Sequence, residues 1–248
     1  MTEDHKSRFE RDGYLVLSEF FSPDQTKEMV DQMNQFERDI VPKLEPKYVF
    51  YQDKQQTDSI FRIEFLQQHH EWFDQIRHNE TIVSLATEIM GEPMDPRQVE
   101  MFGKAPRIGQ ITPPHQDNFY WMLDNGQGCT FWLPIDPVDE VNGCIRYVPG
   151  SHRRGLRPHE SSDTFGFSQG ISDYNPTDER IEVPIKAKPG DLIVHHAMTI
   201  HRADANPSDR LRRALGLIYH AHSAEENTAA KSAYQKKLFQ SWEKKGKL

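Results

Sequence analysis

The spacing of apolar residues predicts helices in the first part of the chain. Ser22 is a typical helix cap and Pro23 a favoured first helical residue, and apolar side chains then recur at Met29, Met33 and Phe36. This spacing places the apolar side chains on one face of a helix. Two further elements are expected before the middle of the chain: a short strand from Tyr14 to Leu17 and a helix from about Thr81 to Met90.

The middle of the chain has a different pattern, which predicts strands. Short apolar or alternating runs are interrupted by Gly, Pro, Asn or Asp about every eight to twelve residues. This pattern is typical of an antiparallel barrel or a double-sheet jelly roll, so we expect a mainly β fold with flanking helices. The predicted strands are Val99 to Lys104, Cys129 to Pro134, Cys144 to Val148, Ile181 to Pro184, Leu192 to His196 and Ala214 to His220.

A length of 248 residues is compatible with one large domain, which is the organisation that we expect. Within it, the pattern indicates a helical region at about residues 20–95 and a β core at about residues 97–222. A basic, weakly amphipathic helix is expected at about residues 229–245. We interpret this last helix as a solvated cover rather than as a binding element.

Composition and charge restrict the possible partners. Hydrophobic residues make up 36% of the chain, and its apolar runs are far shorter than the roughly 20 residues of a membrane-spanning helix. A formal net charge of -8 disfavours nucleic acid and anionic lipid. Cys129 and Cys144 cannot form a disulfide framework, and the N-terminus has no apolar stretch typical of a secretory signal. We therefore expect a cytoplasmic protein that acts on a small molecule.

Two histidines and one aspartate form a candidate metal site. His115 and Asp117 are two residues apart, so on an extended segment their side chains point to the same face and can bind one ion. His201 follows the predicted strand that begins at Leu192 and is a suitable third ligand. Two histidines and a carboxylate with open positions are typical of iron(II) oxygenases. Zinc hydrolases also use this set of ligands, so the ligand types alone leave the metal open.

Arg212 is a candidate binding residue for an anionic co-substrate. It lies eleven residues after His201, at the start of a predicted strand. A guanidinium group can pair with a carboxylate through two hydrogen bonds, which suits the distal carboxylate of a keto acid. Arg213 is expected to face the opposite side of the strand, because neighbouring residues on a strand alternate between faces. A zinc hydrolase would give Arg212 no obvious task.

The order of several motifs resembles that of the phytanoyl-CoA dioxygenase (PhyH) family of iron(II)/2-oxoglutarate oxygenases. The resemblance covers about 85% of the chain, from Asp12 to His220, and its motifs are Pro114-His115-Gln116-Asp117, Asn142-Gly143-Cys144, Pro149-Gly150-Ser151-His152, Pro158-His159, Pro189-Gly190-Asp191, Ile200-His201 and Arg212. It implies a cupin-like double-stranded β-helix, or jelly roll, with iron on His115, Asp117 and His201.

The same resemblance implies roles for residues around the iron. Arg212 would pair with the C5 carboxylate of 2-oxoglutarate. The residues implied near the cofactor pocket are Lys104, Gln116 and Trp132, with His152 as a supporting residue and His159 as a further candidate. The implied reaction uses O₂ and converts 2-oxoglutarate to succinate and CO₂ while a substrate is hydroxylated.

Two departures and one retained residue modify what the resemblance implies. Ala203 and Ala214 stand where family members often have a hydroxyl-bearing residue, so one hydrogen bond to the co-substrate would come from elsewhere. Related halogenases replace the ligand carboxylate with a small residue, whereas this chain keeps Asp117, which disfavours halogenation.

The candidate substrate residues are Arg62, Glu64, Asn118 and Tyr120. Arg62 and Glu64 alternate with apolar residues on a predicted strand from Ser59 to Leu66. If they face the site, they suit a small zwitterion such as an amino acid derivative or an aminophosphonate. We favour the solvent-facing orientation, because charges that alternate along a strand usually face water. A hydroxylase of fatty acyl substrates and a jelly-roll binding protein without catalytic activity remain as alternatives.

Overall fold

The computed structural model describes residues 4–53, 55–162, 169–234 and 236. The helices and 3-10 turns that it contains in this part of the chain lie mainly before and between the strands. They are α1 (His5–Asp12), α2 (Pro23–Asp39), η1 (Val41–Lys43), η2 (Leu66–Gln68), α3 (Glu71–Arg77), α4 (Glu80–Met90), α5 (Asn118–Trp121), η3 (Ser151–Arg154) and α6 (Pro176–Ile181), and a further helical stretch at residues 228–234 follows the last strand.

The larger sheet has seven strands in the order β1-β11-β6-β13-β4-β3-β2, and all neighbours are antiparallel. The order brings strands from both ends of the sequence together, because β1 pairs with β11 and β13 lies between β6 and β4. The strands are β1 (Tyr14–Leu17), β2 (Val49–Tyr51), β3 (Ile60–Ile63), β4 (Met94–Lys104), β6 (Gly128–Pro134), β11 (Leu192–His196) and β13 (Arg212–Ala221).

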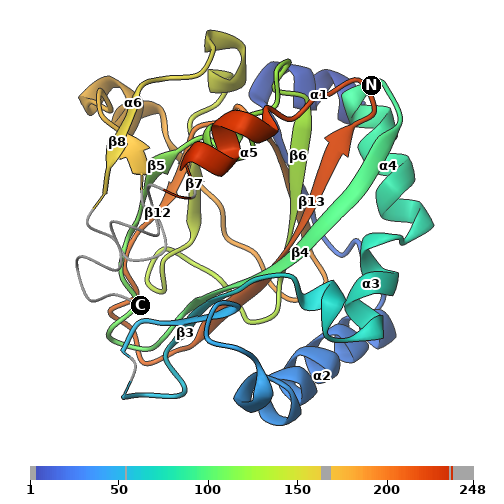
Figure 1. Ribbon diagram of the computed structural model, residues 1–248, viewed down its shortest axis with the longest axis vertical. Coiled ribbons are helices and arrows are strands. Elements are labelled where there is room, and N and C mark those ends of the chain that lie inside the picture. The colour runs from blue at the N-terminus through green and yellow to red at the C-terminus, as the bar shows by residue number, and fades with distance from the viewer. Residues whose placement is uncertain (1–3, 54, 163–168, 235, 237–248) are drawn as a thin grey trace.

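A second antiparallel sheet has the order β10-β7-β12-β5, and β8 pairs with β9 in a separate hairpin-like sheet. Figure 1 shows β5, β7 and β12 on the opposite side of the large sheet from α2, α3 and α4. The fold is therefore two facing sheets with helices outside the larger one. The remaining strands are β5 (Thr112–His115), β7 (Ile145–Tyr147), β8 (His159–Ser161), β9 (Gln169–Ile171), β10 (Val183–Pro184) and β12 (His201–Ala203).

The main hydrophobic core lies between the helices and the outer face of the large sheet. Met33 of α2, Phe73 of α3 and Ile82 of α4 are buried there against strand residues such as Met101 and Leu217. The helix α2 is buried on the face that its apolar spacing predicts, and its N-terminus has the reciprocal capping pair of Ser22 and Gln25. The helices therefore cover one face of the sheet and leave the other face for the site.

Alternation along the long strands separates packing residues from site residues. On β4, Val99 and Met101 belong to the outer core, whereas Glu100 and Lys104 line a cavity on the inner face. On β13, Leu215 belongs to the same outer core. Because successive strand residues point to opposite faces, one sheet supplies both the core and a polar inner wall.

Most of the elements predicted from the sequence are present. The helices expected after Ser22 and at Thr81 to Met90 correspond to α2 and α4, and five of the six strands predicted in the β core correspond to β4, β6, β7, β11 and β13. The prediction of a strand at Ile181 to Pro184 is largely wrong. Ile181 ends α6, whose start has a capping pair of Asn175 and Asp178, so only Val183 and Pro184 pair as a strand.

The predicted C-terminal helix is only partly within the described residues. Residues 228–234 are helical, whereas residues 235 and 237–245 lie outside the described part of the chain. Within that part, no helix is both long enough and apolar enough to cross a membrane.

Candidate active site

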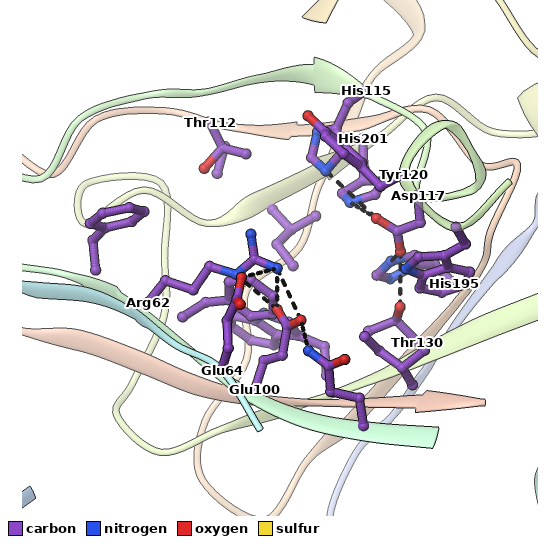
Figure 2. A pocket seen from close by; sticks show the side chains of 18 of the residues that line it. Arg62, Glu64, Glu100, Thr112, His115, Asp117, Tyr120, Thr130, His195 and His201 are labelled. Carbon is purple, nitrogen blue, oxygen red and sulfur yellow. Dashed lines mark hydrogen bonds and ion pairs between the residues drawn. The ribbon is translucent and has the colours of Figure 1, made fainter. Parts of the chain in front are cut away.

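A cavity of about 610 Å³ lies on the inner face of the large sheet. Its wall includes side chains of β4, β6 and β13 from that sheet and of β5 and β12 from the smaller one. Figure 2 shows the polar side chains that converge on it, with His115, Asp117 and His201 on one side of the open space and Arg62, Glu64 and Glu100 on the other. Both groups can therefore contact a ligand in one cavity.

The three candidate metal ligands meet at this cavity. His115 ends β5, Asp117 immediately precedes α5, and His201 begins β12, where it pairs in register with His115. The Oδ1 atom of Asp117 lies 3.6 Å from Nε2 of His115 and 3.6 Å from Nε2 of His201. Separations of this size suit ligand atoms that each lie about 2 Å from a shared ion. The structure thus brings together the three residues that the sequence predicted.

Hydrogen bonds orient both histidines for metal binding. Nδ1 of His115 donates to the carbonyl of Pro113 over 2.8 Å, and Nδ1 of His201 donates to the carbonyl of Thr199 over 3.0 Å. Each bond fixes the ring and leaves the Nε2 lone pair directed toward Asp117. Burial, the largest cause, lowers the pKa of both histidines, so the neutral form that binds metals is favoured.

Asp117 is held through its second carboxylate oxygen. Oδ2 accepts hydrogen bonds from Oγ1 of Thr130 over 2.9 Å and from Nε2 of His195 over 3.1 Å, while Oδ1 faces the histidine ligands. The hydroxyl of Tyr147 donates to Nδ1 of His195 over 2.8 Å, which leaves the proton of the imidazole on Nε2. Burial would raise the pKa of Asp117, but His201 and the bond from His195 outweigh this effect and lower it below the usual range.

His195 is therefore a site residue that the sequence reasoning missed. His195 lies within the predicted strand Leu192 to His196. The residues from Leu192 to His195 are all buried, so this strand has no alternation of polar and apolar residues that would identify the side chain facing the cavity. The adjacent pair His195 and His196 was the available signal. Two neighbouring histidines on a strand must point to opposite faces, so one of them had to face inward.

Replacing His195 with phenylalanine is expected to weaken iron(II) binding about tenfold to a hundredfold, the usual cost of losing a residue that orients a metal ligand. Phenylalanine keeps a ring of similar size but cannot donate to Asp117. Metal affinity is measured by anaerobic iron(II) titration. The matched control is His196→Phe, because His196 does not line the cavity and its Nδ1 accepts from the backbone nitrogen of Met198 over 3.1 Å. Equal affinities of the two variants would rule out a positioning role for His195.

Arg212 and Lys104 form a buried cationic end of the same cavity. They are directly opposite in the β13–β4 ladder, and each residue is 3% exposed. Among the described residues, Nε of Arg212 has no hydrogen-bond partner, and its guanidinium carbon lies 5.6 Å from the ring centre of Trp132. Nζ of Lys104 donates to the carbonyl of Gln110 and lies 3.5 Å from Oγ1 of Thr112.

This cationic end fits a ligand carboxylate. Burial lowers the pKa of Arg212 to about 10, and burial beside Arg212 lowers the pKa of Lys104 well below its usual value. An unpaired charge in a buried site is costly, and an anionic ligand would offset this cost. The unsatisfied nitrogen of Arg212 is thus the feature of this structure that fits the distal carboxylate of 2-oxoglutarate.

Arg213 points to the other face of the sheet, as its position next to Arg212 predicts. Its guanidinium forms two hydrogen bonds of 2.9 Å with Asp136 and one of 2.6 Å with Glu37 of α2. Arg213 therefore joins the sheet to the helical layer, whereas Arg212 remains available in the cavity.

Two residues expected at the 2-oxoglutarate pocket do not line the cavity. The amide of Gln116 points away from Asp117 and donates to the carbonyls of Gly155 and Met198 over 3.0 and 2.8 Å. His152 lies against the turn at Gly13, where its Nε2 donates to the carbonyl of Glu10 over 3.2 Å. Loop contacts therefore turn Gln116 out of the cavity, which corrects its expected position, whereas a supporting role of His152 stays a prediction. Lys104 and Trp132 do line the cavity.

His159 supports the ligand segment from behind. Its Nε2 accepts a hydrogen bond of 3.3 Å from the backbone nitrogen of Gln116, and its ring stacks on Phe119 at 4.2 Å. It is not among the residues that line the cavity. His159 therefore contacts the segment between His115 and Asp117 but not the space where a ligand would bind.

The candidate substrate residues divide into two groups. Tyr120, Arg62 and Glu64 line the cavity, so the solvent-facing orientation favoured for the last two is wrong. The hydroxyl of Tyr120 donates to the carbonyl of Gln169 over 3.0 Å. Asn118 is turned away and closes the loop after α5 through two hydrogen bonds of 3.1 Å with the backbone of Leu123. The sequence reasoning also missed Glu100, which pairs with Arg62.

Comparisons with known proteins agree with this geometry. The chain is 30% identical over 149 residues to a probable phytanoyl-CoA dioxygenase of Caenorhabditis elegans, a match that covers 56% of this chain and 47% of that protein. It is 28% identical to a phytanoyl-CoA dioxygenase of Arabidopsis thaliana, over 88% of each chain. The chain thus spans about half the length of the nematode relative and most of the plant relative.

The fold is shared with solved structures. The epimerase SnoN from nogalamycin biosynthesis, solved with Fe³⁺, alpha-ketoglutarate and nogalamycin RO, aligns with a TM-score of 0.71 and 22% identity, covering 89% of this chain and 84% of that chain. This likeness confirms the predicted jelly roll. The family model for phytanoyl-CoA dioxygenase (PhyH) matches residues 9–214, which include the candidate metal ligands and Arg212. The chain therefore belongs to the phytanoyl-CoA dioxygenase (PhyH) family of iron(II)/2-oxoglutarate-dependent oxygenases.

Proposed function

We propose that this protein is an iron(II)- and 2-oxoglutarate-dependent dioxygenase that hydroxylates a small organic substrate. The observation that carries the proposal is one cavity that contains both a candidate facial set of metal ligands and a buried arginine whose Nε has no partner among the described residues. Two histidines and a carboxylate leave positions on the metal for other ligands. A metal hydrolase would need the ligands but not Arg212.

In this proposal each residue has a defined task. His115, Asp117 and His201 hold the iron, and Arg212 with Lys104 binds the distal carboxylate of 2-oxoglutarate beside the ring of Trp132. Bound iron(II), 2-oxoglutarate and O₂ supply the oxidising chemistry, which yields succinate, CO₂ and a hydroxylated substrate. The facing sheets limit the access of water to this end of the cavity, because both cationic side chains are almost fully buried.

Thr112 is our candidate for the hydroxyl that Ala203 and Ala214 cannot provide. It lies opposite Ala203 in the β12–β5 ladder, and its Oγ1 is 3.5 Å from Nζ of Lys104. A hydroxyl on the neighbouring strand can therefore approach the same co-substrate carboxylate. This placement supports a binding site of the family type despite the two alanines.

We also propose a substrate with charged groups, such as a small zwitterion of the amino acid derivative or aminophosphonate type. The support is that Arg62 and Glu64 line the cavity rather than facing solvent. A fatty acyl substrate is the other class, and it takes its support from the names of the relatives. The phosphates of an acyl-CoA would need basic residues such as Arg153, Arg154 and Arg157, and Arg157 already pairs with Asp173 and Asp178.

The proposal is tested by screening metabolites with the purified iron(II) protein under air. The expected result is 2-oxoglutarate consumption that rises with one class of substrate and gives succinate together with a product heavier by one oxygen atom. Turnover of acyl-CoA compounds but of no zwitterion would reject the substrate class. An absence of 2-oxoglutarate consumption and of succinate under all conditions would favour a binding protein without catalytic activity.

A further inference from the structure

A charged wall, consisting of Arg62, Glu64 and Glu100, lies across the cavity from the candidate metal ligands (Figure 2). Arg62 is on β3, Glu64 directly follows that strand, and Glu100 is on the neighbouring β4. The three side chains thus come from one edge of the large sheet. Their position opposite the metal ligands is where the reacting part of a substrate would pass.

Within the charged wall, Arg62 is already engaged by carboxylates. Its Nε and Nη2 donate to the two oxygens of Glu100 over 3.0 and 2.9 Å, and Nη2 also lies 3.1 Å from Oε1 of Glu64. This two-point pairing uses the guanidinium edge that would otherwise bind a ligand carboxylate or phosphonate. Arg62 is therefore unsuited to be the main receptor for an anionic group.

The charged wall has more negative than positive charge. It contains two carboxylates and one guanidinium, and the Glu100 side chain is only 3% exposed. Burial raises the pKa of Glu100 to about 7, with a further contribution from Glu64, although Arg62 acts in the opposite direction. Two carboxylates on one guanidinium are therefore costly to keep ionised, and a nearby ligand cation would reduce that cost.

A second buried polar atom without a partner among the described residues also faces the cavity. His220 lines the cavity near the end of β13 opposite to Arg212, and its residue exposure is 9%. Among the described residues, Nε2 of His220 has no hydrogen-bond partner. A buried polar atom without a partner is uncommon and suggests that a ligand or water normally completes it. The cavity therefore has unsatisfied nitrogen atoms at both ends.

We propose that Glu64 and Glu100 bind a positively charged ammonium group of the primary substrate and that Arg62 is a positioning residue between them. This inference rests on the proposed function and specifies the substrate class of the same site. An ammonium group provides three donors and one positive charge, so it can contact both carboxylates and balance the excess charge. For a zwitterion, the anionic group would then point away from Arg62, toward His220.

The inference is tested with four-carbon probes on the anaerobic protein loaded with iron(II) and 2-oxoglutarate. The probes are butylammonium, 4-aminobutyrate, 1-butanol and butyrate, and binding is followed by the change in the iron–2-oxoglutarate absorption band. We expect the two ammonium compounds to bind at least about tenfold more tightly than 1-butanol and butyrate, because charge-assisted hydrogen bonds are stronger than neutral ones. The shift in Tm of the metal-free protein gives a second readout.

The main variant is Glu64→Gln, because the Glu64 side chain is 23% exposed and its loss is tolerated better than that of buried Glu100. We expect it to remove most of the preference for ammonium. The control is Glu226→Gln, which removes a carboxylate that also lines the cavity but pairs with Lys231.

Failure of the proposed function and failure of the ammonium site give different experimental results. If the absorption band does not form with 2-oxoglutarate, the proposed function fails. If the band forms but the wild-type protein prefers butyrate, or does not distinguish the four probes, the ammonium site is rejected. The same conclusion holds if Glu64→Gln and Glu226→Gln reduce the preference equally.

Discussion

The variant Asp117→Ala is expected to lose tight iron(II) binding and all measurable hydroxylation while it remains folded. Loss of a residue that merely orients a ligand already costs about tenfold to a hundredfold in metal affinity, so loss of the ligand itself should cost more than about a hundredfold. The fold should persist, because the hydrogen bonds and ion pairs of the Asp117 carboxylate with described residues are to side chains of the site: Thr130 and His195 at one oxygen and the two histidine ligands at the other.

The measurements for Asp117→Ala are iron(II) titration, succinate formation and thermal unfolding. The control is Asp209→Ala, which removes an exposed carboxylate that pairs with the exposed side chain of Arg107. Succinate formation and hydroxylation by Asp117→Ala at the rate of the wild-type protein would show that Asp117 is not a required ligand.

The variant Arg212→Ala should raise the apparent KM for 2-oxoglutarate far more than that for the primary substrate. Loss of a charge-assisted pair in a buried site typically costs about 2 to 5 kcal/mol, which corresponds to about thirtyfold to several thousandfold in affinity. The effect should be confined to the co-substrate, because Arg212 lies at the end of the cavity next to Lys104 and away from the charged wall.

Arg213→Ala provides a matched control with the opposite pattern. Arg213 pairs with Asp136 and Glu37 on the outer face of the sheet, so its loss should reduce the free energy of unfolding by about 3 kcal/mol or more. Its KM for 2-oxoglutarate should stay within about twofold of the wild-type value. If Arg212→Ala also keeps a KM within twofold, another residue must bind the carboxylate.

The parts of the site that the sequence predicted depend on local geometry. The two-residue spacing of His115 and Asp117 predicted that both side chains lie on one side, and both line the cavity although β5 ends at His115 and Asp117 precedes α5. Arg212 and Arg213 separate because they are adjacent on a strand. The helices α2 and α4 were predictable for a similar reason, since capping residues and apolar spacing act within the helix itself.

The remaining parts depend on contacts between distant segments. The orientation of Arg62 depends on its pairing with Glu100 of the neighbouring strand and with Glu64, and local spacing does not indicate the pairing with Glu100. His195 contacts Asp117 across 78 positions of the chain. Distant contacts can also keep a residue out of the site. Gln116 is turned away from the cavity by hydrogen bonds to the carbonyls of Gly155 and Met198. Strand pairing and loop packing decide these orientations, and neither can be read from local spacing.

The central claim is that iron(II) and 2-oxoglutarate bind together in this cavity, and anaerobic absorption spectroscopy tests it most directly. Iron(II) is added to the metal-free protein, followed by 2-oxoglutarate, and the visible spectrum is recorded before O₂ is admitted. We expect a weak charge-transfer band that saturates with 2-oxoglutarate, is absent with zinc(II), is lost in Asp117→Ala and requires much more 2-oxoglutarate in Arg212→Ala. A wild-type protein that binds iron(II) but gives no band at saturating 2-oxoglutarate would contradict the claim.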